Sequence, residues 1–170
     1  MTVHLPIERS LNDAHVGAID EVNRWRGHCV ECYARLEYEV VGTLSAMAAK
    51  PCSNISVPHN FGEKVKKLRA AVGPDGLFKR PKLANALDSF TNHLNRRNML
   101  VHATGKVWTD GKGEWLWLYR FQPSGKGRPV EEGHFEQGEA LAIEKSLARE
   151  SQSLGGQLRA LREKLKAVTE

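Results

Sequence analysis

The stretch Pro81-Lys82-Leu83-Ala84-Asn85-Ala86-Leu87-Asp88-Ser89-Phe90-Thr91-Asn92-His93-Leu94-Asn95-Arg96-Arg97-Asn98-Met99-Leu100-Val101-His102-Ala103 predicts a helix with two side-chain stripes. Proline suits a first helical turn, where its missing N–H is not needed. Apolar residues recur at three- and four-residue steps, with Arg97 interrupting them: Leu83, Leu87, Phe90, Leu94 and Val101. A polar stripe runs one residue over: Thr91, Asn95, Asn98 and His102. Gly105 is expected to stop this helix just after Ala103.

Three polar side chains near the end of the predicted helix have uses at a phosphodiester. Arg97 can make paired hydrogen bonds to phosphate oxygens. His102 can move a proton near neutral pH, and Asn98 can donate to or accept from a ribose or phosphate oxygen. On an ideal helix Arg97 and His102 point about 140° away from each other. The alternative is structural, because an arginine and a histidine near a helix end often complement the dipole or pack as polar residues.

The motif Arg97-Asn98-x-x-x-His102 resembles the signature of the HEPN (higher eukaryotes and prokaryotes nucleotide-binding) family. That family consists of compact all-α domains, many of them metal-independent endoribonucleases that act as dimers. The layout of the chain is also similar, with a long first helix, a basic second helix and the motif near the end of the third. Family toxins neutralised by a nucleotidyltransferase usually carry a tyrosine two residues after the histidine. That position is Thr104 here, which argues against that partnership.

The resemblance implies a mainly α fold, a HEPN-like antiparallel helical bundle with one β-hairpin inserted before the last helix. It also implies a homodimeric endoribonuclease that needs no metal or cofactor and acts in toxin or phage-defence biology, with room for a neutralising partner protein. The catalytic residues would be Arg97, Asn98 and His102. A two-fold axis beside the motif helix would bring two Arg/His pairs into one cleft. The rival hypothesis is a non-catalytic HEPN-like module that binds a nucleotide or RNA, or mediates dimerisation.

The segments before the motif helix predict two further helices in a single domain, residues 1–170. A long apolar stripe predicts a first helix from about Asn12 to Ala49, which Pro51 ends. Asn60 and Glu63 form a capping-box pattern that opens a short helix, closed by Gly73 and Pro74.

The segments after the motif helix predict a hairpin at about 106–121 and a last helix. Four aromatic residues of the hairpin would share one face: Trp115, Trp117, Tyr119 and Phe121. Such a row can stack on bases, but a place in the core or in an interface is favoured. Residues 122–133 predict a Gly/Pro-rich loop. The last helix, from about Gly138 to Val168, carries leucines at heptad spacing: Leu147, Leu154, Leu158, Leu161 and Leu165.

The net charge of +5 is concentrated in one segment, Phe61 to Lys82. Seven basic residues lie there against only Glu63 and Asp75: Lys64, Lys66, Lys67, Arg69, Lys79, Arg80 and Lys82. A local basic patch favours polyanions, although many charge runs are simply solvated helix faces. The predicted RNA-binding residues are Lys66, Lys67, Arg69, Lys79, Arg80 and Lys82 of this segment, together with Arg96 beside the motif.

The remaining features are weaker. An odd number of cysteines, three, favours a reducing compartment, so a cytoplasmic location is expected. The chain shows no segment that could span a membrane. Cys29 and Cys32 form a CxxC, but buried thiols are a better interpretation than zinc, which needs four ligands. Glu37 and Glu39 are both candidates for an acid near the motif, and sequence alone does not say which of them faces it.

Overall fold

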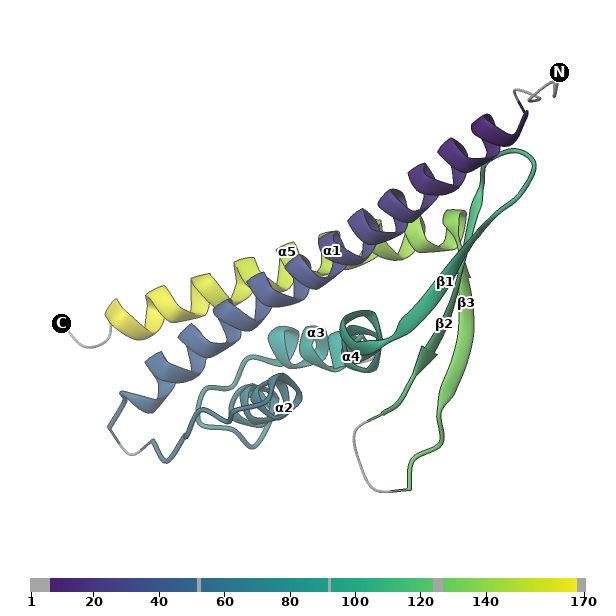
Figure 1. Cartoon of the computed structure of the whole chain (residues 1–170). Coiled ribbons are helices and arrows are strands. Elements are labelled where there is room, and N and C mark those ends of the chain that lie inside the picture. The colour runs from purple at the N-terminus through teal and green to yellow at the C-terminus, as the bar shows by residue number, and fades with distance from the viewer. Residues whose placement is uncertain (1–6, 52, 92, 124–126, 168–170) are drawn as a thin grey trace, which may run out of the picture. The chain divides into compact units, whose positions relative to one another are not determined.

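The computed structural model describes residues 7–51, 53–91, 93–123 and 127–167, with side chains from residue 13 onward. Within these residues the elements follow the order α1 (Ile7–Ala48), α2 (Phe61–Val72), α3 (Pro81–Thr91), α4 (Leu94–His102), β1 (Thr104–Thr109), β2 (Trp115–Phe121), β3 (Glu131–Glu136) and α5 (Gln137–Ala167) (Figure 1). The predicted mainly α fold is confirmed. No helix of the described residues combines the length and apolarity needed to cross a membrane.

The chain divides into two compact units. Unit 1 comprises Met1–Val30 and Asn98–Ser146, and unit 2 comprises Glu31–Arg97 and Leu147–Glu170. Three helices, α1, α4 and α5, pass from one unit into the other along the chain. The single domain over residues 1–170 stays a prediction.

Unit 2 is helical. At the start of α2 the side chain of Asn60 accepts a hydrogen bond from the backbone N–H of Glu63 at 2.8 Å, which confirms the predicted cap. The Glu63 carboxylate does not complete the box, because it pairs with Lys66 at 3.1 Å. α2 packs on α3, with the ring centroid of Phe61 at the start of α2 6.4 Å from that of Phe90 near the end of α3. The core of this unit is built from buried apolar residues of α1, α2, α3 and α5: Leu36, Val40, Leu44, Val65, Leu68, Leu87, Phe90 and Leu158.

The predicted continuous helix from Pro81 to Ala103 is wrong at one point. α3 ends at Thr91 and α4 begins at Leu94, while Asn92 lies outside the described residues. The N–H of His93 donates to the carbonyl of Phe90 at 2.9 Å, a tighter turn than an α-helical one. The interruption shifts the helical phase. Met99 and Leu100 are therefore buried, whereas Val101, predicted on the apolar stripe, is exposed.

Gly105 does not stop a helix as predicted, because it lies inside β1. A Cβ at this position would collide with the Trp117 indole and the Leu118 carbonyl oxygen. The glycine therefore permits close approach of β1 to β2 rather than a left-handed helix end. Its role belongs to the sheet.

The strands of unit 1 form a three-stranded antiparallel sheet in the order β1-β2-β3, side by side in Figure 1. The single predicted hairpin is thus incomplete, because β3 occupies part of the predicted loop at residues 122–133. In the register, Trp117 lies between Val107 and Phe135. Trp115, Trp117 and Phe121 are buried, Tyr119 is half-buried against Trp117, and Leu118 is exposed, so most of the predicted shared aromatic face lies in the core.

Helix α1 supplies the other layer of unit 1 through Trp25. Its ring lies with centroids 5.8 Å from both Trp115 and Trp117 and 5.3 Å from Phe135. These tilted and edge contacts suit aromatic quadrupoles. The core of unit 1 is therefore an aromatic cluster between one helix and one sheet face.

In unit 2, α1 and α5 run in the same direction. Cys32 and Arg35 of α1 line a pocket with Ala148 and Ser151 of α5. Further along both helices, Glu39 contacts Arg159, and Thr43 contacts the carbonyl of Leu158. The predicted antiparallel bundle is wrong for this pair of helices. Four of the predicted heptad leucines are buried along α5: Leu147, Leu154, Leu158 and Leu161.

Candidate functional site

Arg97 belongs to a charged cluster of unit 2. Its Nη2 lies 3.9 Å from Oε2 of Glu37, on α1. The other oxygen of Glu37 accepts a hydrogen bond of 2.6 Å from Nζ of Lys64, on α2, whose side chain is only 13% exposed. One carboxylate is therefore shared by two cations from two helices. Of the two candidate acids, Glu37 is the one beside the motif arginine.

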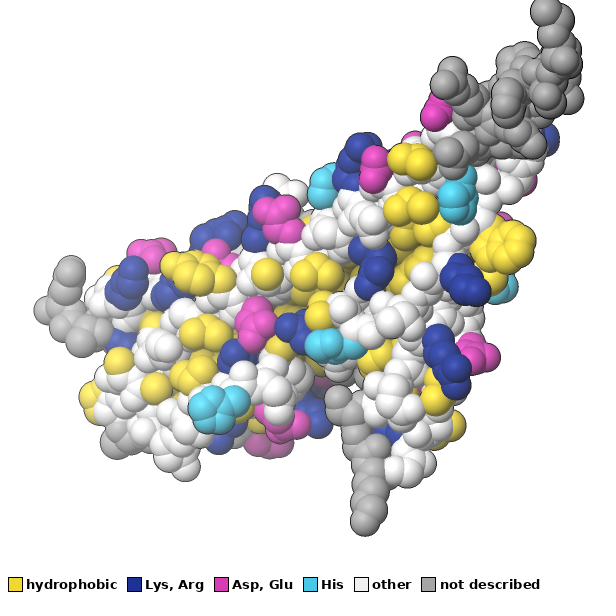
Figure 2. Space-filling model, viewed as in Figure 1, with side chains coloured by type: hydrophobic (Ala, Val, Ile, Leu, Met, Phe, Trp, Pro, Cys, Tyr) yellow, Lys and Arg dark blue, Asp and Glu magenta, His cyan; other side chains and the backbone are white. Residues whose placement is uncertain are grey.

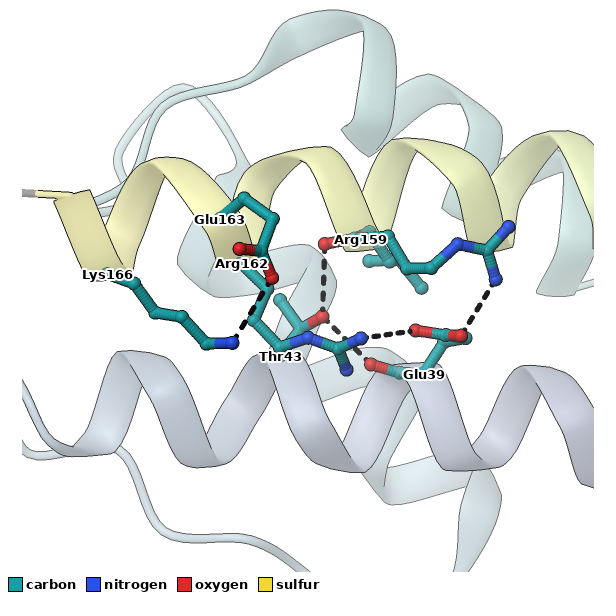
Figure 3. Close-up of polar contacts among 7 residues, drawn as sticks. Glu39, Thr43, Arg159, Arg162, Glu163 and Lys166 are labelled. Carbon is teal, nitrogen blue, oxygen red and sulfur yellow. Dashed lines mark hydrogen bonds and ion pairs between the residues drawn. The ribbon is translucent and has the colours of Figure 1, made fainter.

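Glu39 faces another way. Its Oε1 accepts a hydrogen bond from Arg159 at 2.8 Å, and Nη2 of Arg162 lies 3.1 Å from its Oε2 (Figure 3). Thr43 donates to the backbone carbonyl of Glu39 at 2.8 Å. Because Glu39 itself is buried, these two arginines of α5 compensate its charge. Glu39 thus ties α1 to α5 within unit 2.

His93 anchors Arg96, the neighbour of the motif arginine. The side chain of His93 is 14% exposed, with Nε2 3.0 Å from Oε2 of Glu150 and Nδ1 3.3 Å from Nη1 of Arg96. A guanidinium has only donors, so Nδ1 accepts and Nε2–H donates to the carboxylate. Tyr33 also donates to the backbone carbonyl of His93 at 3.0 Å. Sequence analysis missed this histidine, because the helix interruption at which it lies becomes visible only in the structure.

His102 and Asn98 belong to unit 1, where both are exposed. His102 is the last residue of α4, and within the described part of the chain its side chain makes no hydrogen bond or ion pair. Arg97 falls in unit 2, so the motif is divided between the two units along a single helix. The imidazole is open to solvent and chemically available.

Arg26 of α1 holds the end of α4 in unit 1. Its Nη2 donates to the carbonyls of Leu100 at 2.8 Å and Ala103 at 3.1 Å, and its Nε donates to Leu100 at 3.2 Å. These acceptors are among the carbonyls that a helix end leaves unsatisfied. The guanidinium also lies over the Trp117 ring, 4.6 Å from its centroid. Burial lowers the pKa of Arg26. This arginine, also missed by sequence analysis, fixes the turn that carries His102.

The basic segment of unit 2 is partly neutralised. Arg69 makes a bidentate pair with Asp88, at 2.9 and 3.0 Å, and this hydrogen bonding holds the pKa of Asp88 below its ordinary value and raises that of Arg69. Lys66 pairs with Glu63. Within the described residues no salt bridge engages four others of the segment: Lys67, Lys79, Arg80 and Lys82. The positive surface left for a polyanion is therefore smaller than the sequence suggests.

The CxxC pair lies on α1. Cys29 is buried, as predicted, and Cys32 is half-buried beside the α5 pocket of unit 2. Cys52 lies outside the described residues. Among the described residues no group of three or more His, Cys, Asp or Glu side chains is arranged to hold a metal ion.

Comparison of the chain with protein-family models, with curated proteins and with solved structures found no match.

Proposed function

We propose that this protein is a HEPN-type endoribonuclease that acts as a homodimer without a metal ion. The observation that carries the proposal is His102, an exposed imidazole on the last turn of α4 whose backbone Arg26 holds in place. The side chain is accessible, and the end of its helix accepts hydrogen bonds from Arg26 at the carbonyls of Leu100 and Ala103. Both properties suit a group that must meet a substrate and move a proton.

The reaction follows from the chemistry of RNA. His102 removes the proton of a ribose 2′-hydroxyl, and the 2′-oxygen forms a bond to the adjacent phosphorus. The bond from phosphorus to the 5′-oxygen breaks, and that oxygen takes a proton from the second imidazole of the dimer. Arg97 stabilises the charge that grows on the phosphoryl oxygens, and Asn98 orients the backbone. The products carry a 2′,3′-cyclic phosphate and a 5′-hydroxyl.

Glu37 and Lys64 act as positioning residues in this proposal. The shared carboxylate lies near enough to orient the Arg97 guanidinium, and the 2.6 Å hydrogen bond from Lys64 holds that carboxylate in place. The cytoplasmic location, RNA as partner and a toxin or defence role rest on the motif and the resemblance. The exposed cations Lys79, Arg80 and Lys82 would add affinity without base preference, since lysines bind phosphates as point charges.

Cleavage of RNA in EDTA tests the proposal. The parent should cut single-stranded RNA to cyclic-phosphate and 5′-hydroxyl ends and leave DNA intact, because DNA lacks the nucleophile. His102→Ala should lose at least about 100-fold in rate, the usual contribution of a proton-transfer group. His134→Ala is the matched control, since His134 is an exposed histidine of β3 in the same unit. Parent-rate cutting by His102→Ala, 5′-phosphate products or a strict need for magnesium would overturn the mechanism.

A non-catalytic HEPN-like module is the second candidate, favoured by the Arg97–Glu37 ion pair, which suits a purely structural arginine. In that case the parent binds RNA and leaves it uncut. Light scattering at micromolar concentration then tests the two-imidazole mechanism, because the shared cleft requires a dimer, whereas a dimer by itself fits both candidates. A monomeric parent that cuts RNA would contradict the two-imidazole mechanism.

A further inference from the structure

The outer edge of the sheet in unit 1 carries a pocket that the proposed chemistry does not use. Its volume is about 530 Å³, within the range of small-molecule sites. Part of its wall is β1, the strand that begins two residues after His102 and pairs only with β2 in the described sheet. The opposite wall is the amino-terminal half of α1, including His15, Ile19 and Asn23.

The walls of this pocket combine aromatic surface with positive charge. Trp108 of β1 is 59% exposed, although a tryptophan seldom faces solvent without a partner. Lys106 and Arg26 bring two cations, while Asn23 brings an amide that can donate and accept. No carboxylate stands among its described lining residues. Figure 2 shows apolar side chains gathered over this half of α1 and the adjoining sheet edge, with basic and histidine side chains among them.

We infer that this pocket binds one unpaired nucleotide of single-stranded RNA, with its base stacked on Trp108 and its phosphate beside Lys106. Charge complementarity selects an anion, and the exposed indole selects a flat aromatic group, so a nucleotide satisfies both demands. Arg26 links the pocket to the motif helix, because the guanidinium that lines the pocket also binds the Leu100 and Ala103 carbonyls.

The pocket lies within a few nucleotides of the proposed chemistry. Trp108 follows His102 by six residues, and an extended chain of that length spans at most roughly 20 Å. Both residues are in unit 1. A base held at Trp108 would therefore belong to the same RNA strand as the bond presented to His102. The placement of the cleaved bond relative to the pocket rests on the proposed function, whereas the binding of a nucleotide at Trp108 does not.

Fluorescence anisotropy with a labelled 2′-O-methyl oligoribonucleotide measures binding without cleavage. Trp108→Ala should weaken affinity about tenfold, because stacking contributes that order per base, and Trp108→Phe should recover most of it. Lys106→Ala should weaken affinity and reduce its salt dependence. Tyr38→Ala is the matched control, since Tyr38 is an exposed aromatic of unit 2 that does not line the pocket.

Affinity of Trp108→Ala within twofold of the parent overturns the inference. So does a Trp108→Ala variant whose only change is a lower mass by light scattering, because Trp108 would then be a contact between protein subunits. The proposed function can fail separately. If the parent leaves native RNA uncut but Trp108→Ala still binds that RNA more weakly than the parent, the nuclease proposal is wrong and the pocket proposal stands. If Trp108→Ala binds and cuts RNA as well as the parent does, the pocket proposal is wrong and the nuclease proposal stands.

Discussion

The interactions that stabilise unit 1 internally differ from those that stabilise unit 2. Unit 1 packs a sheet on a helix through a cluster of large aromatic rings around Trp25 and Trp117, joined by the half-buried guanidinium of Arg26. Unit 2 packs helices mainly through aliphatic residues and links them with carboxylates that each contact two cations: Glu37 with Lys64 and Arg97, and Glu39 with Arg159 and Arg162. The motif is divided between them. Its histidine belongs to the aromatic unit, while its arginine belongs to the ionic one.

This difference predicts that the stability of unit 1 depends on the volume of its buried aromatic rings. Trp117 is 1% exposed and contacts three other rings and Arg26. Trp117→Ala should lower the free energy of unfolding by about 3–5 kcal/mol, because a large buried side chain leaves a cavity. Urea denaturation measures the loss. Trp108→Ala on the same sheet is the control and should change stability by less than about 0.5 kcal/mol. Equal losses in both variants would contradict an aromatic core at Trp117.

Unit 2 should instead be sensitive to single charges. Glu39→Gln keeps the shape but leaves Arg159 and Arg162 without their shared carboxylate, so stability should fall by about 1–2 kcal/mol. The loss stays below that of a fully buried pair, since Arg159 is half exposed and solvent screens it. Glu31→Gln, in the exposed pair with Arg35, is the control and should cost under about 0.5 kcal/mol. A Glu39→Gln variant as stable as Glu31→Gln would show that the ion pairs of Glu39 do not stabilise unit 2.

The smallest effect is expected at the exposed edge of unit 2, and it should depend on pH. Hydrogen bonds from Arg69 lower the pKa of Asp88 in the folded state. The pair therefore stabilises above the unfolded pKa of about 4, and this contribution is lost as the pH falls through the lower folded value. The melting temperatures of parent and Asp88→Asn should differ slightly at pH 7 and converge towards pH 3. Asp75→Asn serves as control. If the difference in melting temperature between the parent and Asp88→Asn grew as the pH fell, the stabilising role given to the ionised Asp88 carboxylate would be wrong.

Local sequence signals predicted much of the fold. Asn60 as a helix cap, Pro51 as a helix end, and the alternation of Trp115, Trp117 and Phe121 are local patterns, and each is confirmed. They succeed because a cap or an alternating strand is set by neighbours within a few residues. β3 was missed because Phe135 is its only large apolar residue, so the strand depends on pairing with β2.

Local sequence patterns could not predict which residues surround the motif. Sequence placed Arg97, Asn98 and His102 near one helix end, because that needs only helical periodicity. The choice of Glu37 over Glu39 beside Arg97, the Arg26 bonds to the end of α4, and the interruption at His93 all required the tertiary structure. Each depends on side chains that lie tens of residues apart in the chain. Periodicity shows which residues share a face, whereas the packing of elements decides what that face meets.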